Sequence, residues 1–172
     1  IAALKIFQGS KIILNTELIS RDPCSMGMAG KGSRGLRSTC RDTLKQGGKA
    51  PRMLVIPDIA MQPAFAIGKY EVSWGEFNQY CHVSGECKVL TSVNEQLPVT
   101  GISIEQARAY IFWLNAQTWS TYKLPTKQQW LSASQAEDSE PDPNRNCQVE
   151  VRGIRKGVNL LSVRSRQQNP WG

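Results

Sequence analysis

The chain has 172 residues, 40% of them hydrophobic and 20% charged, which excludes wholesale disorder and suits one domain with a core. No window of about 18 apolar residues occurs, so we expect no direct membrane insertion of this chain. The net charge is +7, and it is unevenly spread. Residues 1–52 carry ten Lys/Arg against three Asp/Glu and residues 152–172 carry five against none, whereas residues 53–151 carry six against eleven. Aromatic residues are not interleaved with these basic ones, so no nucleic-acid partner is expected.

Little regular structure is predicted for the first part of the chain, residues 1–45. We expect residues 1–45 to be a basic lead-in to a domain that occupies residues 46–172. Within the lead-in, "KIILNTELI" fits either a strand or a helix end, and the glycine-rich "CSMGMAGKGSRG" predicts a loop. This loop lacks the Gly-Lys-Ser/Thr order of a phosphate-binding loop. The chain does not start with Met, and we expect it to be trimmed or a piece of a longer protein.

Two strands are expected after the turn "QGGKAP". The apolar run "MLVIP" at 53–57 predicts a short strand that is closed by its proline. The segment "FAIGKYEVS" at 65–73 alternates, which predicts a second strand with Tyr70 and Val72 on one face. Later in the chain, "QVEVRGIRKGVNLLSV" predicts short strands with a turn at Gly157.

Three helices are predicted from capping boxes, in which a Ser or Thr is followed three residues later by Glu or Gln. The pattern occurs at Ser73, at Ser103 and at Thr126. The first two helices are expected to run to about residues 82 and 118. Apolar spacing assigns their buried faces, which are expected to contain Phe77, Tyr80, Cys81, Ala107, Tyr110, Ile111 and Leu114.

The third helix presents Trp130 and Ala133 on one face. A Trp at such a position is far more often packed in a core than placed at a cofactor, so Trp130 is expected to be buried.

The five cysteines favour disulfides over a metal site. The spacing of Cys81 and Cys87 around "HVSGE" suits a local disulfide at a helix end, and Cys24 can pair with Cys40 across the glycine-rich loop. Cys147 is then left over. Disulfides imply an oxidising compartment, whereas five reduced thiols in a cytosolic protein are the alternative reading.

No catalytic or metal-binding residue is predicted. A zinc site needs about four Cys or His ligands at suitable spacing, and His82 is the only histidine. A dyad of Cys81 and His82 is disfavoured, because adjacent helical residues point about 100° apart. The acidic loop "EDSEPDPNRNC" offers oxygen atoms to calcium but lacks the glycine and the final glutamate of an EF-hand, so a solvated loop is favoured.

Five motifs in chain order carry a family resemblance: "RMLVIP", "FAIGKYEVSWGEFNQYC", "LPVTGISIEQARAYIFWLN", "YKLPTKQQW" and "NPWG". Together they resemble the formylglycine-generating enzyme family, also called the sulfatase-modifying-factor domain, over about residues 50–172. The resemblance implies a loop-rich α+β fold related to C-type lectins, and one that is incomplete at its C-terminal end. The residues that we expect to be structural are Ser73, Trp74, Ser103, Trp113, Pro125, Thr126, Trp130 and Trp171.

The family includes oxidases that modify a sulfatase cysteine, and extracytoplasmic domains of bacterial membrane-bound Ser/Thr kinases. In this sequence Lys127 and Gln129 replace the two glutamates of the family's "TEAEW" motif, and the chain ends before the family's copper-binding cysteine pair. The resemblance therefore implies no cofactor in this chain, with copper or calcium confined to longer members.

We expect a non-catalytic sensing or protein-binding module that is periplasmic or extracellular, with a protein or peptide as its partner. The alternative is the N-terminal part of a metal-dependent formylglycine-generating oxidase, so whether the chain belongs to an enzyme stays open.

Overall fold

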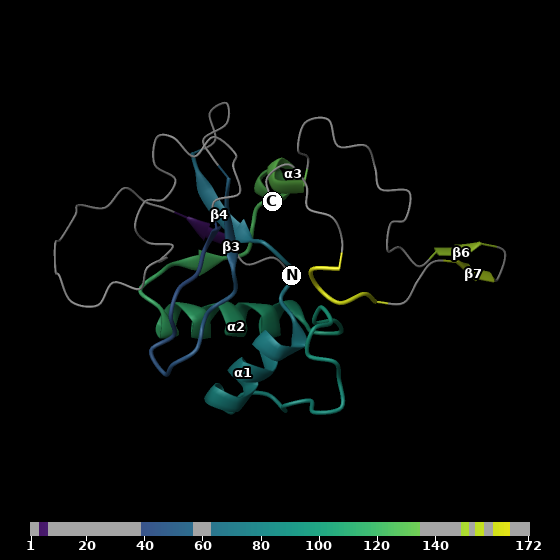
Figure 1. Ribbon diagram of the computed structural model, residues 1–172, viewed down its shortest axis with the longest axis horizontal. Coiled ribbons are helices and arrows are strands. Elements are labelled where there is room, and N and C mark those ends of the chain that lie inside the picture. Colours follow the sequence, from purple (N-terminus) through teal and green to yellow (C-terminus); the bar gives the residue numbers. More distant parts are fainter. Residues whose placement is uncertain are drawn as a thin grey trace.

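A computed structural model describes residues 4–6, 39–56, 63–134, 149–151, 154–156 and 160–165. This part of the chain has an α+β architecture, as predicted, with a mixed set of short strands and helices (Figure 1). The strands of the larger sheet are β1 (Leu4–Ile6), β2 (Thr39–Cys40), β3 (Met53–Ile56), β4 (Phe65–Gly68) and β5 (Tyr122–Lys123). The helices are α1 (Trp74–Ser84), α2 (Ile104–Gln117) and α3 (Lys127–Ser134), and β6 (Val149–Val151) pairs with β7 (Ile154–Lys156).

The larger sheet is antiparallel, with the strand order β2-β3-β4-β1-β5. All four residues of β3 are buried, because both faces of the sheet are covered. On one face Met53 and Val55 join the main core with α1 and α2. On the other face Leu54 and Ile56 form a second cluster, against which Ala133 of α3 packs. Figure 1 shows α1 and α2 together on one side of the sheet and α3 apart from them.

The three predicted capping boxes are all present. In each, the hydroxyl of the first residue accepts from the backbone N–H three residues on, and that residue's side chain accepts from the first residue's N–H. These bonds satisfy N–H groups that have no partner inside the helix. The pairs are Ser73–Glu76, Ser103–Gln106 and Thr126–Gln129.

Aromatic rings from α1 and α2 form the centre of the main core. Phe77 lies 5.4 Å from Tyr80 and 5.7 Å from Tyr110, measured between ring centroids. Tyr110 in turn stacks on Trp113 at 5.9 Å. All four side chains are buried, so the predicted apolar faces of these two helices are confirmed. The rings hold α1 against α2 through edge-to-face and stacked contacts.

The predicted second strand is too long. Strand β4 ends at Gly68, and the chain then leaves β3 for a different partner. The Val99 N–H donates to the carbonyl of Val72 at 2.8 Å, and Ser73 forms an isolated antiparallel β-bridge with Pro98. Val72 is buried against the connection between α1 and α2 rather than in the sheet. The alternation of apolar and polar residues therefore continues past the end of the strand.

The prediction that Trp130 is buried is wrong. Its side chain is 53% exposed, whereas Trp113 is buried as a scaffold residue should be. Helix α3 has only eight residues and buries none of them fully, because only the small Ala133 reaches the second cluster. Pro125 is half-buried, and Trp171 lies outside the described residues.

Strands β6 and β7 are present as predicted, and they pair with each other. Val151 pairs with Ile154, so the chain reverses between these two residues. Gly157, at which a turn is predicted, lies outside the described residues.

Candidate functional site

The connection that follows α1 runs back along that helix without forming helix or strand. We call residues 85–97 the stapled loop. Gly85 starts it with a φ of 70°, and its N–H donates to the carbonyl of Cys81 at 3.0 Å. Glycine adopts the left-handed conformation after the last helical turn without strain. The helix therefore ends sharply and the chain turns back on α1.

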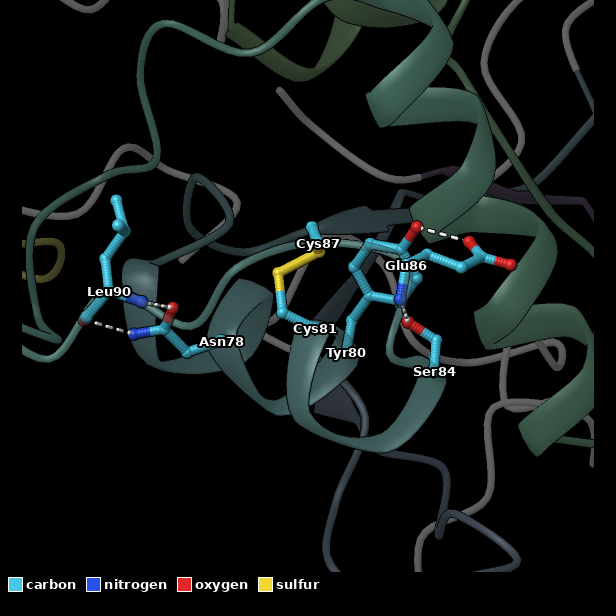
Figure 2. Close-up of a disulfide and its surroundings, with 7 residues drawn as sticks. All are labelled: Asn78, Tyr80, Cys81, Ser84, Glu86, Cys87 and Leu90. Atoms are coloured by element: carbon cyan, nitrogen blue, oxygen red, sulfur yellow. Dashed lines mark hydrogen bonds between the residues drawn. A yellow bond between two sulfur atoms is a disulfide. The ribbon is translucent and has the colours of Figure 1, made fainter.

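A disulfide fixes the beginning of the stapled loop. Cys81 of α1 is bonded to Cys87 with an S–S distance of 2.06 Å and a Cα–Cα distance of 4.8 Å, as the spacing predicts (Figure 2). Next to it, the Tyr80 hydroxyl donates to a carboxylate oxygen of Glu86 at 2.6 Å. The first three residues of the loop are thus held by one covalent and one short polar contact.

A buried amide fixes the middle of the loop. Asn78 of α1 donates from Nδ2 to the carbonyl of Leu90 at 2.8 Å and accepts from the Leu90 N–H at 3.0 Å (Figure 2). Asn78 is 7% exposed, so the two bonds replace the water contacts that its amide would otherwise lose. A side chain that bonds both backbone groups of one residue fixes that residue in position and direction.

The end of the loop is bonded to the beginning of α1. The carbonyl of Leu97 accepts from the Trp74 N–H and that of Glu95 accepts from the Gly75 N–H, each at 2.9 Å. These are first-turn N–H groups that lack a partner within the helix. A Cβ at position 75 would lie 3.3 Å from the Glu95 Cβ, so glycine there allows the close approach. The helix and the loop therefore complete each other's hydrogen bonds.

The outer side of the stapled loop is polar and exposed. None of its exposed residues is a large apolar one, and acidic and basic groups both occur. The exposed residues after the glycine are Glu86, Lys88, Thr91, Ser92, Asn94, Glu95 and Gln96. A surface of this kind, held in place by its inner side, can bind a partner through hydrogen bonds without first becoming ordered.

The contact between Tyr80 and Glu86 predicts a pH dependence. Burial, and after it the hydrogen bond to Glu86, raises the pKa of Tyr80 to about 12. The folded protein thus favours the neutral phenol of Tyr80. The contribution of this group to the unfolding free energy is fully present below about pH 10, the pKa of an unperturbed Tyr, and is lost as pH rises toward 12. Between these pH values we expect the wild type to lose more unfolding free energy than Tyr80→Phe, by up to about 1 kcal/mol per pH unit.

Denaturant unfolding at a series of pH values measures the difference. Below pH 9 the two profiles are expected to run parallel, which serves as the control. Parallel profiles through the alkaline range as well would show that Tyr80 titrates as it does in the unfolded chain.

The other predicted cysteine pair stays a prediction. Cys40 is disulfide-bonded, but its proposed partner Cys24 lies outside the described residues, as does Cys147. His82 is exposed, and its neighbour Cys81 is held in the disulfide, so the two do not form a catalytic dyad. The acidic loop considered for calcium also lies outside the described residues.

Sequence reasoning missed Asn78 and Gly75, the two α1 residues that hold the loop. The one available signal was the amide of Asn78, which lies between the apolar positions 77 and 81. A polar side chain on a buried face needs a hydrogen-bond partner, so this position pointed to an unidentified contact. Nothing in the sequence indicates that the partner is Leu90.

No group of three or more His, Cys, Asp or Glu side chains that could hold a metal occurs within the described ranges. Copper bound by thiolates does not fit these residues, because Cys40, Cys81 and Cys87 are all in disulfides. None of the helices in the described part of the chain is long and apolar enough to span a membrane.

Comparison with known families gives a match over the middle of the chain. Residues 43–146 match the family model described as a sulfatase-modifying factor enzyme 1-like domain. The match covers more than half of the chain and contains α1, the stapled loop, α2 and α3. It begins and ends earlier than the resemblance at about residues 50–172, and the expected boundary between a lead-in and a domain at residue 46 stays a prediction. No curated protein and no solved structure matches the chain.

Proposed function

Since the chain belongs to the sulfatase-modifying factor enzyme 1-like family, we propose that it is a non-catalytic module that binds a protein or peptide through the stapled loop. The observation that carries this proposal is the way in which the loop is held. Its inner side is bonded to α1 at the disulfide, at Asn78 and at the first turn of the helix, while its outer side is exposed.

The length of the loop supports a binding role. Connections of more than about 12 residues without secondary structure are uncommon in compact domains, and those that are ordered often carry function. A loop that is already ordered loses little conformational freedom on binding, so more of the contact energy contributes to affinity.

A location outside the cytoplasm is part of the proposal. The Cys81–Cys87 disulfide supports it, because disulfides persist in oxidising compartments and are rare in the cytosol. A sensing domain of a bacterial membrane-bound Ser/Thr kinase is the context that the sequence resemblance suggests for such a module.

An oxidase is the second candidate, because the matching family model takes its description from a sulfatase-modifying factor enzyme. On this reading the described residues form the N-terminal scaffold of a longer metal-dependent protein that modifies a sulfatase cysteine. The two candidates differ in whether a substrate cysteine is converted, which is a direct measurement.

The binding proposal is tested with a library of random peptides displayed on phage and selected on the oxidised protein. Ser92 lies exposed in the stapled loop, and Ser134 lies exposed at the end of α3. We expect Ser92→Arg to weaken the binding of the selected peptides by about tenfold or more, because a large charged side chain then occupies the contact surface. Ser134→Arg, which makes the same change elsewhere, is expected to leave their affinity unchanged. Equal affinities of both variants and the wild type would remove the loop as the contact surface.

A further inference from the structure

A second exposed feature lies directly after α2. The indole of Trp119 is 89% exposed, although its neighbours Thr118 and Ser120 are both buried. Phe112, on the outer side of α2, is 75% exposed. Large aromatic side chains stabilise a protein strongly when their apolar area is buried. An almost wholly exposed indole between two buried residues is therefore unusual.

The backbone on both sides of this indole is held rigidly. The Thr118 hydroxyl donates to the carbonyl of Leu114 at 2.9 Å and accepts from the Ser120 N–H at 3.3 Å. Asn115 donates to the carbonyl of Tyr122 at 3.1 Å and accepts from the Tyr122 N–H. The exposed ring therefore projects from a segment that is bonded to α2 before and after it.

Lys45 positions the ring itself. Its backbone N–H donates to the carbonyl of Gln117 at 2.9 Å, and its Nζ donates to the carbonyl of Ala116 at 2.7 Å. These are carbonyls of the last helical turn, which have no partner within the helix and favour a nearby cation. The same Nζ lies 4.7 Å from the centroid of the Trp119 ring, a cation–π contact.

The turn that carries Lys45 is positively charged on its outside. Lys45 and Lys49 are exposed and Arg41 is half-buried. The one acidic residue of residues 41–50, Asp42, is 5% exposed and accepts from the Tyr122 hydroxyl at 2.6 Å. A partner that meets this surface thus encounters an indole in contact with Lys45, on a turn whose other exposed charged residue, Lys49, is also a cation and whose single carboxylate, that of Asp42, is buried.

We propose that Trp119 and the turn of residues 41–50 form a docking site for an acidic peptide segment of a partner protein. An apolar side chain of the peptide packs on the indole, and flanking carboxylates face Lys45 and Lys49. Buried Trp side chains are common anchors of protein interfaces, and complementary charge adds specificity and a faster association.

Single-stranded nucleic acid fits this surface less well. Platforms for single strands combine basic residues with successive aromatic rings, and the turn of residues 41–50 contains no aromatic residue. The docking site does not depend on the stapled loop, and it is compatible with either candidate function.

The test uses a fluorescently labelled hexapeptide, Glu-Glu-Leu-Phe-Glu-Glu, and fluorescence anisotropy at about 0.05 M salt, where screening of exposed charges is weak. We expect binding to the wild type with a Kd below about 1 mM. Trp119→Ala is expected to weaken it by about tenfold or more, whereas Trp130→Ala, which removes another exposed indole, leaves it unchanged. The peptide in which Gln replaces each Glu is expected to bind about tenfold more weakly, because the charge complementarity is lost.

Three results would overturn the proposal: no binding of the acidic peptide at 1 mM, equal losses in the two Trp variants, or equal affinity for the Gln peptide. Binding of an oligothymidylate that Trp119→Ala abolishes, without binding of the peptide, would assign the surface to nucleic acid instead. Ser92→Arg is expected to bind the acidic peptide as the wild type does, so a failure of the stapled-loop proposal is distinguishable from a failure of this one.

Discussion

Replacing Phe77 with alanine is expected to lower the free energy of unfolding by about 3–5 kcal/mol. The Phe77 ring is 3% exposed and contacts the rings of Trp74, Tyr80 and Tyr110. Its removal leaves a cavity where α1 meets α2, and the neighbouring rings lose their edge contacts. Equilibrium unfolding in guanidinium chloride, followed by fluorescence, measures the change.

Phe112→Ala is the matched control for this experiment. The same truncation is made on α2, but at a side chain that is 75% exposed, so the expected loss is below about 0.5 kcal/mol. Similar losses in both variants would mean that Phe77 does not lie at the centre of the core, and the packing of α1 on α2 described above would be incorrect.

Removing the Cys81–Cys87 disulfide is expected to lower the unfolding free energy by about 2 kcal/mol. This loss of unfolding free energy is at the lower end of the range for disulfides. The cysteines are only six residues apart, and closing so short a loop restricts the unfolded chain modestly. We also expect faster amide hydrogen exchange at Leu90, whose N–H is bonded to Asn78 within the stapled loop. Exchange in α2 is expected to change much less.

The variant Cys81→Ala with Cys87→Ala is compared with Cys87→Ala alone. Both lack the cross-link, so both are expected to lose a similar amount of stability if the cross-link accounts for the effect. Unchanged exchange at Leu90 in the double variant would show that Asn78 and the first turn of α1 hold the loop without the disulfide.

The sequence predicts the helices of this fold better than its sheet. A capping box is a local pattern, because the bonds of Ser73, Ser103 and Thr126 reach only three residues along the chain. The disulfide of Cys81 with Cys87 is equally local. Local spacing was therefore sufficient for each of these features.

The features that were missed depend on contacts between distant segments. Strand β1 lies between β4 and β5, although its pairing of Leu4 with Ile67 joins residues more than 60 positions apart in the chain. Asp42 accepts from Tyr122 across 80 positions. The exposure of Trp130 likewise depends on which residues of α3 reach the sheet, and periodicity within eight residues cannot decide that.

The candidate site was predictable only in outline. The disulfide marks where the stapled loop begins, but its later anchors, Asn78 and Gly75, acquire their roles only when the loop folds back on α1. The exposure of Trp119 was also not predicted, since a Trp that follows an apolar helix is expected to be buried.

The most direct test of the proposed function is an assay of cysteine oxidation. The natural gene product, with its ends established by intact mass, is supplied with copper and oxygen and incubated with a cysteine-containing peptide from a sulfatase. Mass spectrometry then follows the peptide. A non-catalytic binding module predicts that the cysteine stays unchanged, and conversion of the cysteine to formylglycine would contradict this account and assign the chain to an oxidase.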